Sequence, residues 1–268
     1  MKKRLITAVE LKEIQLEILK TIHDFCLQND IRYSLAAGTL LGAIRHKGYI
    51  PWDDDIDIMM PRPDYERFCR IFPNYSKHYK IQNYHTDDTY WYNFGKVIDT
   101  RTMLTEPGAR TGVYVDVFII DGLPDNEIVI QETESKVSYL IHHDLRYATR
   151  EYKTKSMLTK KLIHYFKYLY RKTIVQKREI TVNMIDSILK QNPFETSAKA
   201  GLLFYEHFEC VLPISTYYYY QDIEFEKITL RCICDYHTYL KSDYGNYMEL
   251  PPVQKRISHH HINAFKID

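Results

Sequence analysis

The feature that most constrains the fold of this chain is a single aspartate, Asp116, inside the apolar segment YVDVFII. The β-branched and aromatic residues around it are typical of a buried strand. An unpaired carboxylate inside such a strand is costly to bury. Something must therefore compensate the charge of Asp116, and a neighbouring strand that placed it beside other carboxylates would complete a site able to hold one or two divalent ions.

A second acidic segment, DDDIDIMM, places four carboxylates within five residues from Asp53 onward. Side chains alternate between the two faces of a strand, so Asp55 and Asp57 project together while the isoleucines between and after them face the buried side. Carboxylates this close repel one another unless a cation neutralises them. We therefore expect Asp55, Asp57 and Asp116 to form a catalytic centre that holds Mg²⁺ or Mn²⁺ for phosphoryl chemistry. The alternative is a solvated acidic loop that caps a helix.

Four other residues are candidates for contacting phosphate. Gly38 and Thr39 follow the predicted strand YSLAA and open a helix, where backbone N–H groups and a hydroxyl face an anion. Arg45 lies near the other end of that helix, and Lys96 lies within an aromatic segment. A diphosphate requires such cations, although a plain helix cap and surface charges explain the same residues one by one.

Hydrophobic spacing and turn residues predict a succession of helices and strands. Thr7 and Glu10 form a capping-box pattern ahead of apolar residues spaced three and four apart, which predicts a helix over 8–28. A short strand, a glycine turn, a short helix, a loop, a second strand and a helix opened by Pro63 are predicted next. Later strands are predicted over 79–84, 90–98 and 113–120 and near IEFEKITLRC, and a short helix over 235–243.

The fold class predicted from these elements is α+β, a mixed sheet core flanked by helices with a helical insertion. Residues 126–192 are helical in pattern and contain no glycine, which is typical of a separate helical lobe. We expect a catalytic core over 1–125, a helical lobe over 126–200 and a segment over 201–268 that closes on the core.

Composition excludes some classes of function. The formal net charge is +1, from 36 basic and 35 acidic residues, so a generally basic nucleic-acid-binding protein is not expected. No apolar segment reaches the length of a membrane span, and the amino-terminal segment carries charges where a signal peptide is apolar. The expectation is a cytoplasmic protein.

Three segments together resemble the signature of the LicD family, which includes fukutin and fukutin-related protein. They are AGTLLGAIRHKGYIPWDDDIDIMMPRPDY, GVYVDVFIIDGLP, and YLKSDYGNYMELPP followed by SHHH. The resemblance implies a nucleotidyltransferase-like fold with a glycine turn, a strand bearing paired carboxylates and a third carboxylate from a later strand. In this chain, the positions that the resemblance assigns to the glycine turn and the three carboxylates are occupied by Gly38, Thr39, Asp55, Asp57 and Asp116. The chain departs from the pattern at Asn246, where many relatives have an aspartate.

The resemblance also implies a reaction. Bacterial members transfer phosphocholine from CDP-choline to a sugar hydroxyl of a teichoic acid or lipopolysaccharide precursor, and animal members transfer ribitol phosphate from CDP-ribitol. The expected partners are therefore a CDP-activated donor and a lipid-linked glycan acceptor. Transfer of ribitol or glycerol phosphate, nucleotidyl transfer to a small acceptor, and a non-enzymatic metal-binding scaffold are the alternatives.

Two further expectations follow if the transferred group is choline. Aromatic rings bind quaternary ammonium ions, so Tyr90, Trp91 and Tyr92 are candidates for a choline cage, with an ordinary aromatic core as the alternative. Residues 153–178 carry nine Lys or Arg and no Asp or Glu. This stretch predicts either peripheral contact with the inner face of the cell membrane or a solvated basic helix face. The run His259–His261 has no assigned role.

Overall fold

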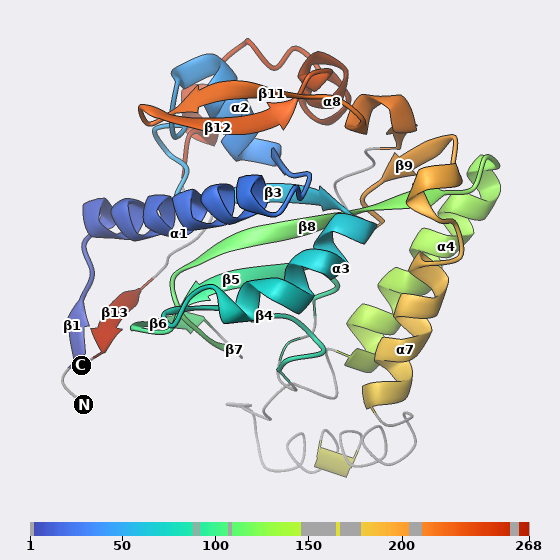
Figure 1. Ribbon diagram of the computed structural model, residues 1–268, viewed down its shortest axis with the longest axis horizontal. Helices are drawn as coiled ribbons and strands as arrows, with labels where there is room; N and C mark the ends of the chain where they lie inside the picture. Colours follow the sequence, from blue (N-terminus) through green and yellow to red (C-terminus); the bar gives the residue numbers. More distant parts are fainter. Residues whose placement is uncertain are drawn as a thin grey trace.

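The fold was analysed in a computed structural model of the chain (Figure 1). The residues that the structure describes are 3–87, 90, 92–106, 109–145, 165–166, 178–203, 211–257 and 263–267.

Helix α1 (Ala8–Gln28) begins where the capping box predicts. The Thr7 hydroxyl accepts a hydrogen bond from the backbone N–H of Glu10 at 3.2 Å, and the Glu10 carboxylate accepts one from the backbone N–H of Thr7 at 2.9 Å. The two groups satisfy N–H donors that have no partner within the helix. One face of α1 is buried in the core, through Leu11, Gln15, Ile18, Leu19, Ile22, Phe25 and Cys26. The predicted helix over 8–28 is confirmed.

A mixed sheet forms the centre of the molecule. Strands β3 and β8 run parallel, whereas the pairs β2–β3, β5–β8, β4–β5, β8–β9 and β9–β10 are antiparallel. The predicted α+β class with a mixed sheet is confirmed. The strands are β2 (Ser34–Leu35), β3 (Asp57–Pro61), β4 (Tyr79–Gln82), β5 (Gly95–Asp99), β8 (Tyr114–Leu123), β9 (Lys199–Gly201) and β10 (Leu212–Pro213).

Two short helices flank the sheet beside α1. Helix α2 (Ala37–His46) connects β2 to the acidic loop, and helix α3 (Arg62–Ile71) follows β3 directly, with Pro63 in its first turn. Helix α1 contacts β5 and β8, and α3 contacts β3 and β8. All five residues of β3 are buried as a result. The two central strands therefore lie inside the core, where a charged side chain needs a partner.

Helices α4 (Glu127–Tyr139) and α7 (Arg178–Leu189) lie side by side, away from α1 (Figure 1). A π-helical segment, Leu140–Leu145, continues α4. Their apolar faces form a second core cluster with aromatic residues that include Tyr84, Tyr90 and Phe94. The helical pattern predicted for 126–192 is confirmed where the structure describes it. Of the basic stretch 153–178, only 165–166 and Arg178 are described, so its predicted membrane contact stays a prediction.

Two smaller sheets complete the fold. One contains β1 (Lys3–Leu5), β13 (Ala264–Ile267), β6 (Thr102–Glu106) and β7 (Ala109–Thr111), and the other is the hairpin β11 (Tyr220–Phe225) and β12 (Ile228–Ile233). Helix α8 (Tyr236–Tyr244) follows the hairpin, and both lie beside α2 (Figure 1). Short 3-10 segments are Phe72–Asn74, Phe194–Thr196, Ile214–Tyr217 and Val253–Lys255. The predicted short helix matches α8, whereas the single strand predicted near IEFEKITLRC is two strands of a hairpin, and β6 and β7 were not predicted.

The strand predicted over 90–98 is wrong in its first half, because β5 begins only at Gly95. Tyr90 and Phe94 are buried in the second core cluster rather than in a strand ladder. Aromatic residues favour strands and packed loops alike when both are half-buried. Composition therefore did not distinguish a strand from a loop that packs against helices.

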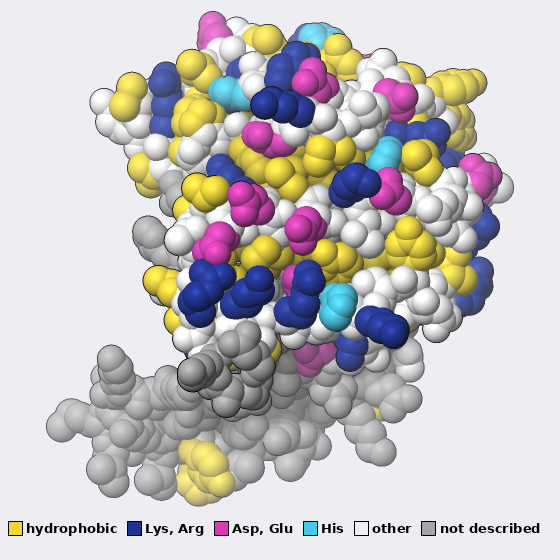
Figure 2. Space-filling model, turned by 60° about the vertical axis from the view of Figure 1, so that its left-hand side comes forward, with side chains coloured by type: hydrophobic (Ala, Val, Ile, Leu, Met, Phe, Trp, Pro, Cys, Tyr) yellow, Lys and Arg dark blue, Asp and Glu magenta, His cyan; other side chains and the backbone are white. Residues whose placement is uncertain are grey.

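The described surface has no strongly one-sided charge on the face in Figure 2, where basic and acidic side chains are interspersed with hydrophobic ones. Within the described ranges, no helix has both the length and the apolar character needed to span a bilayer. The limits predicted for the core, the helical lobe and the closing segment stay predictions.

A buried ion pair joins α3 to β8, and its loss should destabilise the fold. The Arg62 guanidinium binds Asp121 with two hydrogen bonds, one of them 2.8 Å from Nη2 to Oδ2, and both residues are buried. We expect Asp121→Asn to lower the free energy of unfolding by about 3 to 5 kcal/mol, because it leaves a buried guanidinium without its counter-charge. Urea denaturation followed by circular dichroism measures this.

The matched control is Lys20→Ala, which removes the exposed pair between Lys20 and Asp24 on α1. Exposed pairs contribute less than about 1 kcal/mol. If both variants lost equally little stability, the Arg62–Asp121 pair would not be the structural contact described above.

Candidate functional site

Two of the predicted carboxylates lie opposite each other on adjacent parallel strands. Asp57, the first residue of β3, pairs in register with Asp116 of β8. Side chains at paired positions project from the same face of a sheet. Both residues are buried, at 8% and 7% exposure. The structure thus brings Asp57 and Asp116 together, while their predicted metal-binding and catalytic roles stay predictions.

The acidic loop before β3 adds further carboxylates. Asp53, Asp54 and Asp55 are half-buried, and they offer carboxylate oxygen atoms that lie within 4.8 Å of one another. The pKa of Asp53 is raised to about 7. The largest cause is burial, followed by the negative charge of Asp55 and by a hydrogen bond with Asp55. Sequence analysis did not include Asp53 and Asp54 among the site residues, although the run of three aspartates was the available signal.

The loop and the strand carboxylates form one electrostatic group. Burial raises the pKa of Asp57 well above its ordinary value, and the charges of Asp55, Asp116 and Asp53 raise it further, while Lys96 opposes them. Hard divalent cations such as Mg²⁺ and Mn²⁺ prefer oxygen ligands. A set of crowded, partly buried carboxylate oxygen atoms fits such an ion.

The glycine turn lies directly against this group. A Cβ atom on Gly38 would stand 2.6 Å from an Asp53 carboxylate oxygen, so only glycine fits there without displacing Asp53. The Thr39 hydroxyl is buried and accepts a hydrogen bond of 2.8 Å from the backbone N–H of Asp57. Thr39 therefore positions the start of β3. Its predicted contact with phosphate, like that of Gly38, stays a prediction.

Lys96 lies next to Asp116 on the other side from Asp57. It pairs in register with Asp116 across β5 and β8, and its ammonium nitrogen is 2.9 Å from Asp116 Oδ1. The same nitrogen lies 3.3 Å from the centroid of the Tyr114 ring. Lys96 is 5% exposed. The compensating charge that the sequence required for Asp116 is thus a lysine from the neighbouring strand.

Arg45 occupies the last turn of α2 and contacts the carboxyl-terminal part of the chain. Its Nη1 donates hydrogen bonds to the backbone carbonyls of Tyr247 at 2.8 Å and Glu249 at 3.1 Å. The guanidinium therefore holds the segment after α8 against α2. This contact was not foreseen from the sequence, and the predicted role of Arg45 in phosphate binding stays a prediction.

The residues predicted as a choline cage are only partly described. The rings of Tyr90 and Tyr92 lie 5.4 Å apart in an edge-to-face arrangement, and Tyr90 is 3% exposed. The ammonium of Lys96 lies 5.8 Å from the Tyr92 ring centroid, so the chain already presents a cation of its own to this ring. Trp91 lies outside the described residues, as does the run His259–His261.

Sequence analysis missed three residues that surround the carboxylates. Gln15, buried in α1, donates a 2.9 Å hydrogen bond to the backbone carbonyl of Asp54. The hydroxyl of Tyr49 donates at 3.3 Å to the Gln15 side chain. In α8, burial around the hydroxyl of Tyr244 and then the charges of Asp243 and the site aspartates raise its pKa, although the residue as a whole is 37% exposed. The YGNYM segment was the only sequence signal for Tyr244.

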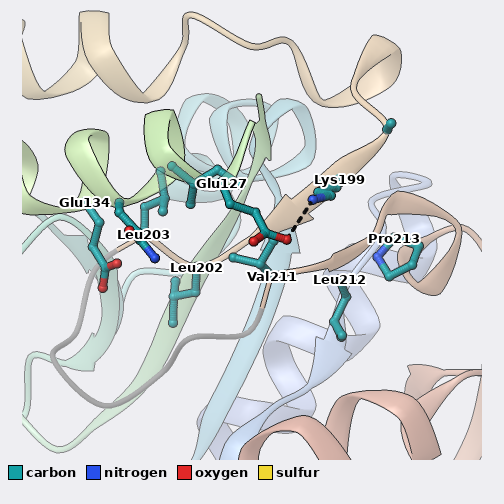
Figure 3. A pocket seen from close by; sticks show the side chains of 11 residues that line it. Glu127, Glu134, Lys199, Leu202, Leu203, Val211, Leu212 and Pro213 are labelled. Carbon is teal, nitrogen blue, oxygen red and sulfur yellow. Dashed lines mark ion pairs between the residues drawn. The ribbon is translucent and has the colours of Figure 1, made fainter. Parts of the chain in front are cut away.

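A pocket of about 460 Å³ lies at the far end of β8, between α4 and the strands β9 and β10 (Figure 3). Leucine side chains line it, and an ion pair of 3.7 Å between Glu127 and Lys199 lies at its edge. Strand β9 pairs with Asp121–Leu123. At roughly 3.3 Å per strand residue, these positions lie well away from Asp116, so the pocket is separate from the carboxylates.

Removing the Thr39 hydroxyl should lower the free energy of unfolding. Thr39→Val keeps the side-chain shape but leaves the buried N–H of Asp57 without its acceptor, which costs about 1 to 3 kcal/mol of unfolding free energy. Thr39→Ser restores the acceptor and should recover most of that loss. Urea denaturation of the three proteins measures this, and equal stability of the valine and serine variants would contradict the positioning role.

The raised pKa of Asp53 predicts a pH dependence for the metal-free protein. Between pH 3.8, where an ordinary aspartate releases its proton, and about pH 7, the folded chain retains a proton that the unfolded chain has lost. The stability that this proton contributes is complete below pH 3.8 and is lost as the pH rises towards 7. Denaturation in EDTA across this range should show a steeper fall for the native protein than for Asp53→Asn. Parallel curves would contradict the assignment.

Comparison with known proteins agrees with this geometry. The family described as the LicD/FKTN/FKRP nucleotidyltransferase domain matches residues 30–153, which include the glycine turn, the acidic loop, β3 and β8. The lipopolysaccharide cholinephosphotransferase LicD of Haemophilus influenzae is 31% identical over 276 aligned residues, which cover 97% of this chain and 98% of the relative.

Two uncharacterized proteins from Rickettsia also match. The one from Rickettsia typhi is 41% identical over 71 residues, covering 24% of this chain and 23% of the relative. The one from Rickettsia prowazekii is 28% identical over 110 residues, covering 41% and 40%. The match to the Haemophilus protein extends over nearly the whole of both chains, and on that ground the chain belongs to the LicD family.

Proposed function

We propose that the protein is a metal-dependent phosphocholine transferase that uses CDP-choline and a sugar hydroxyl of a lipopolysaccharide or teichoic acid precursor. The observation that carries the proposal is the in-register pair of buried carboxylates, Asp57 and Asp116, beside a loop with three more. The full-length similarity to a lipopolysaccharide cholinephosphotransferase supports the transferred group.

Asp55, Asp57 and Asp116 would hold the ion in this proposal. Mg²⁺ or Mn²⁺, when bound, supplies positive charge that neutralises the donor diphosphate during in-line displacement. The carboxylates fit this task because they offer oxygen ligands, and because burial and then the charges of the neighbouring aspartates raise the pKa of Asp57, which a bound cation would relieve. Thr39 keeps the amino-terminal end of β3 in place through the backbone N–H of Asp57.

Each remaining step is assigned to a group of the chain. Beyond Ala37, whose N–H is bonded to the Tyr239 hydroxyl, the first turn of α2 around Gly38 lies at the positive end of the helix dipole, which would suit the donor phosphates. Asp116, whose negative charge the Lys96 ammonium stabilises, accepts the proton of the acceptor hydroxyl. The acceptor oxygen forms a bond to phosphorus, the bond from phosphorus to the CMP oxygen breaks, and CMP leaves.

The test is CMP release from the purified chain with Mg²⁺, a lipopolysaccharide acceptor and CDP-choline. Asp57→Asn and Asp116→Asn should each lower the rate by at least about a hundredfold, because each removes a carboxylate from the cluster. CDP-ribitol and CDP-glycerol, assayed in parallel, identify the transferred group. Magnesium-dependent CMP release from CDP-choline alone is the expected result.

The control variant is Asp24→Asn, which changes an exposed aspartate on α1 and should leave the rate unchanged. CMP release from CDP-ribitol alone or from CDP-glycerol alone would show that the transferred group is that alditol phosphate and not phosphocholine. Pyrophosphate release from CTP with a small acceptor, without CMP from any donor, would indicate nucleotidyl transfer. Metal binding without consumption of any nucleotide would indicate a scaffold.

A further inference from the structure

Lys96 places a buried ammonium ion in contact with the carboxylate cluster. Its nitrogen lies 2.9 Å from Asp116 Oδ1 and 3.3 Å from the Tyr114 ring centroid. The rings of Phe94 and Tyr92 lie 5.7 and 5.8 Å away. Ring faces attract ammonium ions, so three aromatic groups and one carboxylate together hold this ion in place.

The sheet register puts Asp57 and Lys96 on opposite sides of Asp116. Asp57 pairs with Asp116 from β3, and Lys96 pairs with it from β5. Neighbouring strands lie roughly 4.8 Å apart. Sites that hold two divalent ions place them about 3.5 to 4 Å apart, and a carboxylate can bind both ions through its two oxygen atoms. If Asp116 bound two ions in this way, one would face Asp57 and the other would occupy the place of the Lys96 ammonium.

The Lys96 ammonium and a second divalent ion cannot occupy the same side of Asp116, because both are positively charged. A second divalent ion next to a buried ammonium would meet strong repulsion, because water screens charges poorly at such a position. The ammonium has little room to withdraw, since Lys96 is 5% exposed and its nitrogen lies against Tyr114.

We propose that Lys96 is a built-in cation that takes the place of a second metal ion beside Asp116, so that the carboxylate cluster binds one divalent ion per chain. This inference rests on the metal-dependent reaction proposed above and adds the number of ions. Lys96 acts as a positioning residue, because it fixes the Asp116 carboxylate and closes one side of it to metal.

The experiment is to count bound Mn²⁺ by titrating the full chain and following free Mn²⁺ by electron paramagnetic resonance. The native protein should bind one Mn²⁺ per chain. Lys96→Ala removes the ammonium and opens space beside Asp116, so we expect it to bind two. Lys96→Arg keeps the positive charge and should bind one. Asp57→Asn should bind none in the same range, which separates the cluster from adventitious surface binding.

The matched lysine control is Lys80→Ala, on the neighbouring strand β4, where the side chain is exposed. It should bind one Mn²⁺, as the native protein does. Circular dichroism checks that each variant is folded, and Lys96→Gln, which removes the charge but keeps most of the side-chain length, takes the place of an unfolded Lys96→Ala.

Two Mn²⁺ ions in the native protein would overturn the inference whatever the variants do. One Mn²⁺ in both the native protein and the neutral Lys96 variants would overturn it as well, because the ammonium would then exclude nothing. Counting ions requires no turnover. A protein that binds one Mn²⁺ but releases no CMP would therefore overturn the proposed function and leave the role of Lys96 supported.

Discussion

The parallel pairing of β3 with β8 is the interaction on which the site depends. It places Asp57 and Asp116 at paired positions, buried inside the sheet, and sets the place where the acidic loop must end. A slip of one residue in this register would turn one of the two carboxylates to the opposite face. The apolar residues that alternate with the carboxylates, such as Ile58 and Val117, prevent that slip because they would leave the core.

The groups that hold the acidic loop belong to the rigid part of the fold. Gln15 of α1 binds the carbonyl of Asp54, and Thr39 of α2 binds the N–H of Asp57. Gly38 lets the loop approach α2 closely enough for Asp53 to reach the turn. Repulsion between the carboxylates is therefore resisted by hydrogen bonds anchored in buried helices rather than by the loop itself, which is the arrangement expected of a preorganised site.

The parts of this structure that local patterns determine were predictable. The capping box at Thr7 depends on neighbours in the sequence, and α1 follows it. The strand predicted from the alternation around Asp55 and Asp57 is only partly right, because β3 begins at Asp57 and Asp55 lies in the loop before it. The charge partner of Asp116 was required by burial, but its identity as Lys96 depends on which strand pairs with β8. That pairing leaves no local pattern in a sequence.

Contacts made across long stretches of chain were not predictable for the same reason. Arg45 looked like a free cation, yet its guanidinium binds carbonyl groups about two hundred residues later. Strands β6 and β7 are short and partly polar. They pair with each other, and β6 also pairs with β13, whose position the local sequence does not reveal. The segment YWYNF has strand-like composition, but the rings of Tyr90, Tyr92 and Phe94 pack in the core cluster that α4 and α7 help to form.

The segment over 201–268 is the last part of the chain to be made on the ribosome, yet it contacts a helix near the amino terminus. The N–H of Ala37 is bonded to the hydroxyl of Tyr239, and Arg45 reaches Tyr247, so the two sides of this contact are made far apart in time. Domains generally fold as units, so the contacts that α2 makes with α8 and the segment after it can form only when nearly the whole chain has been synthesised. The site therefore reaches its final form late in synthesis, although the strands that carry the carboxylates are made early.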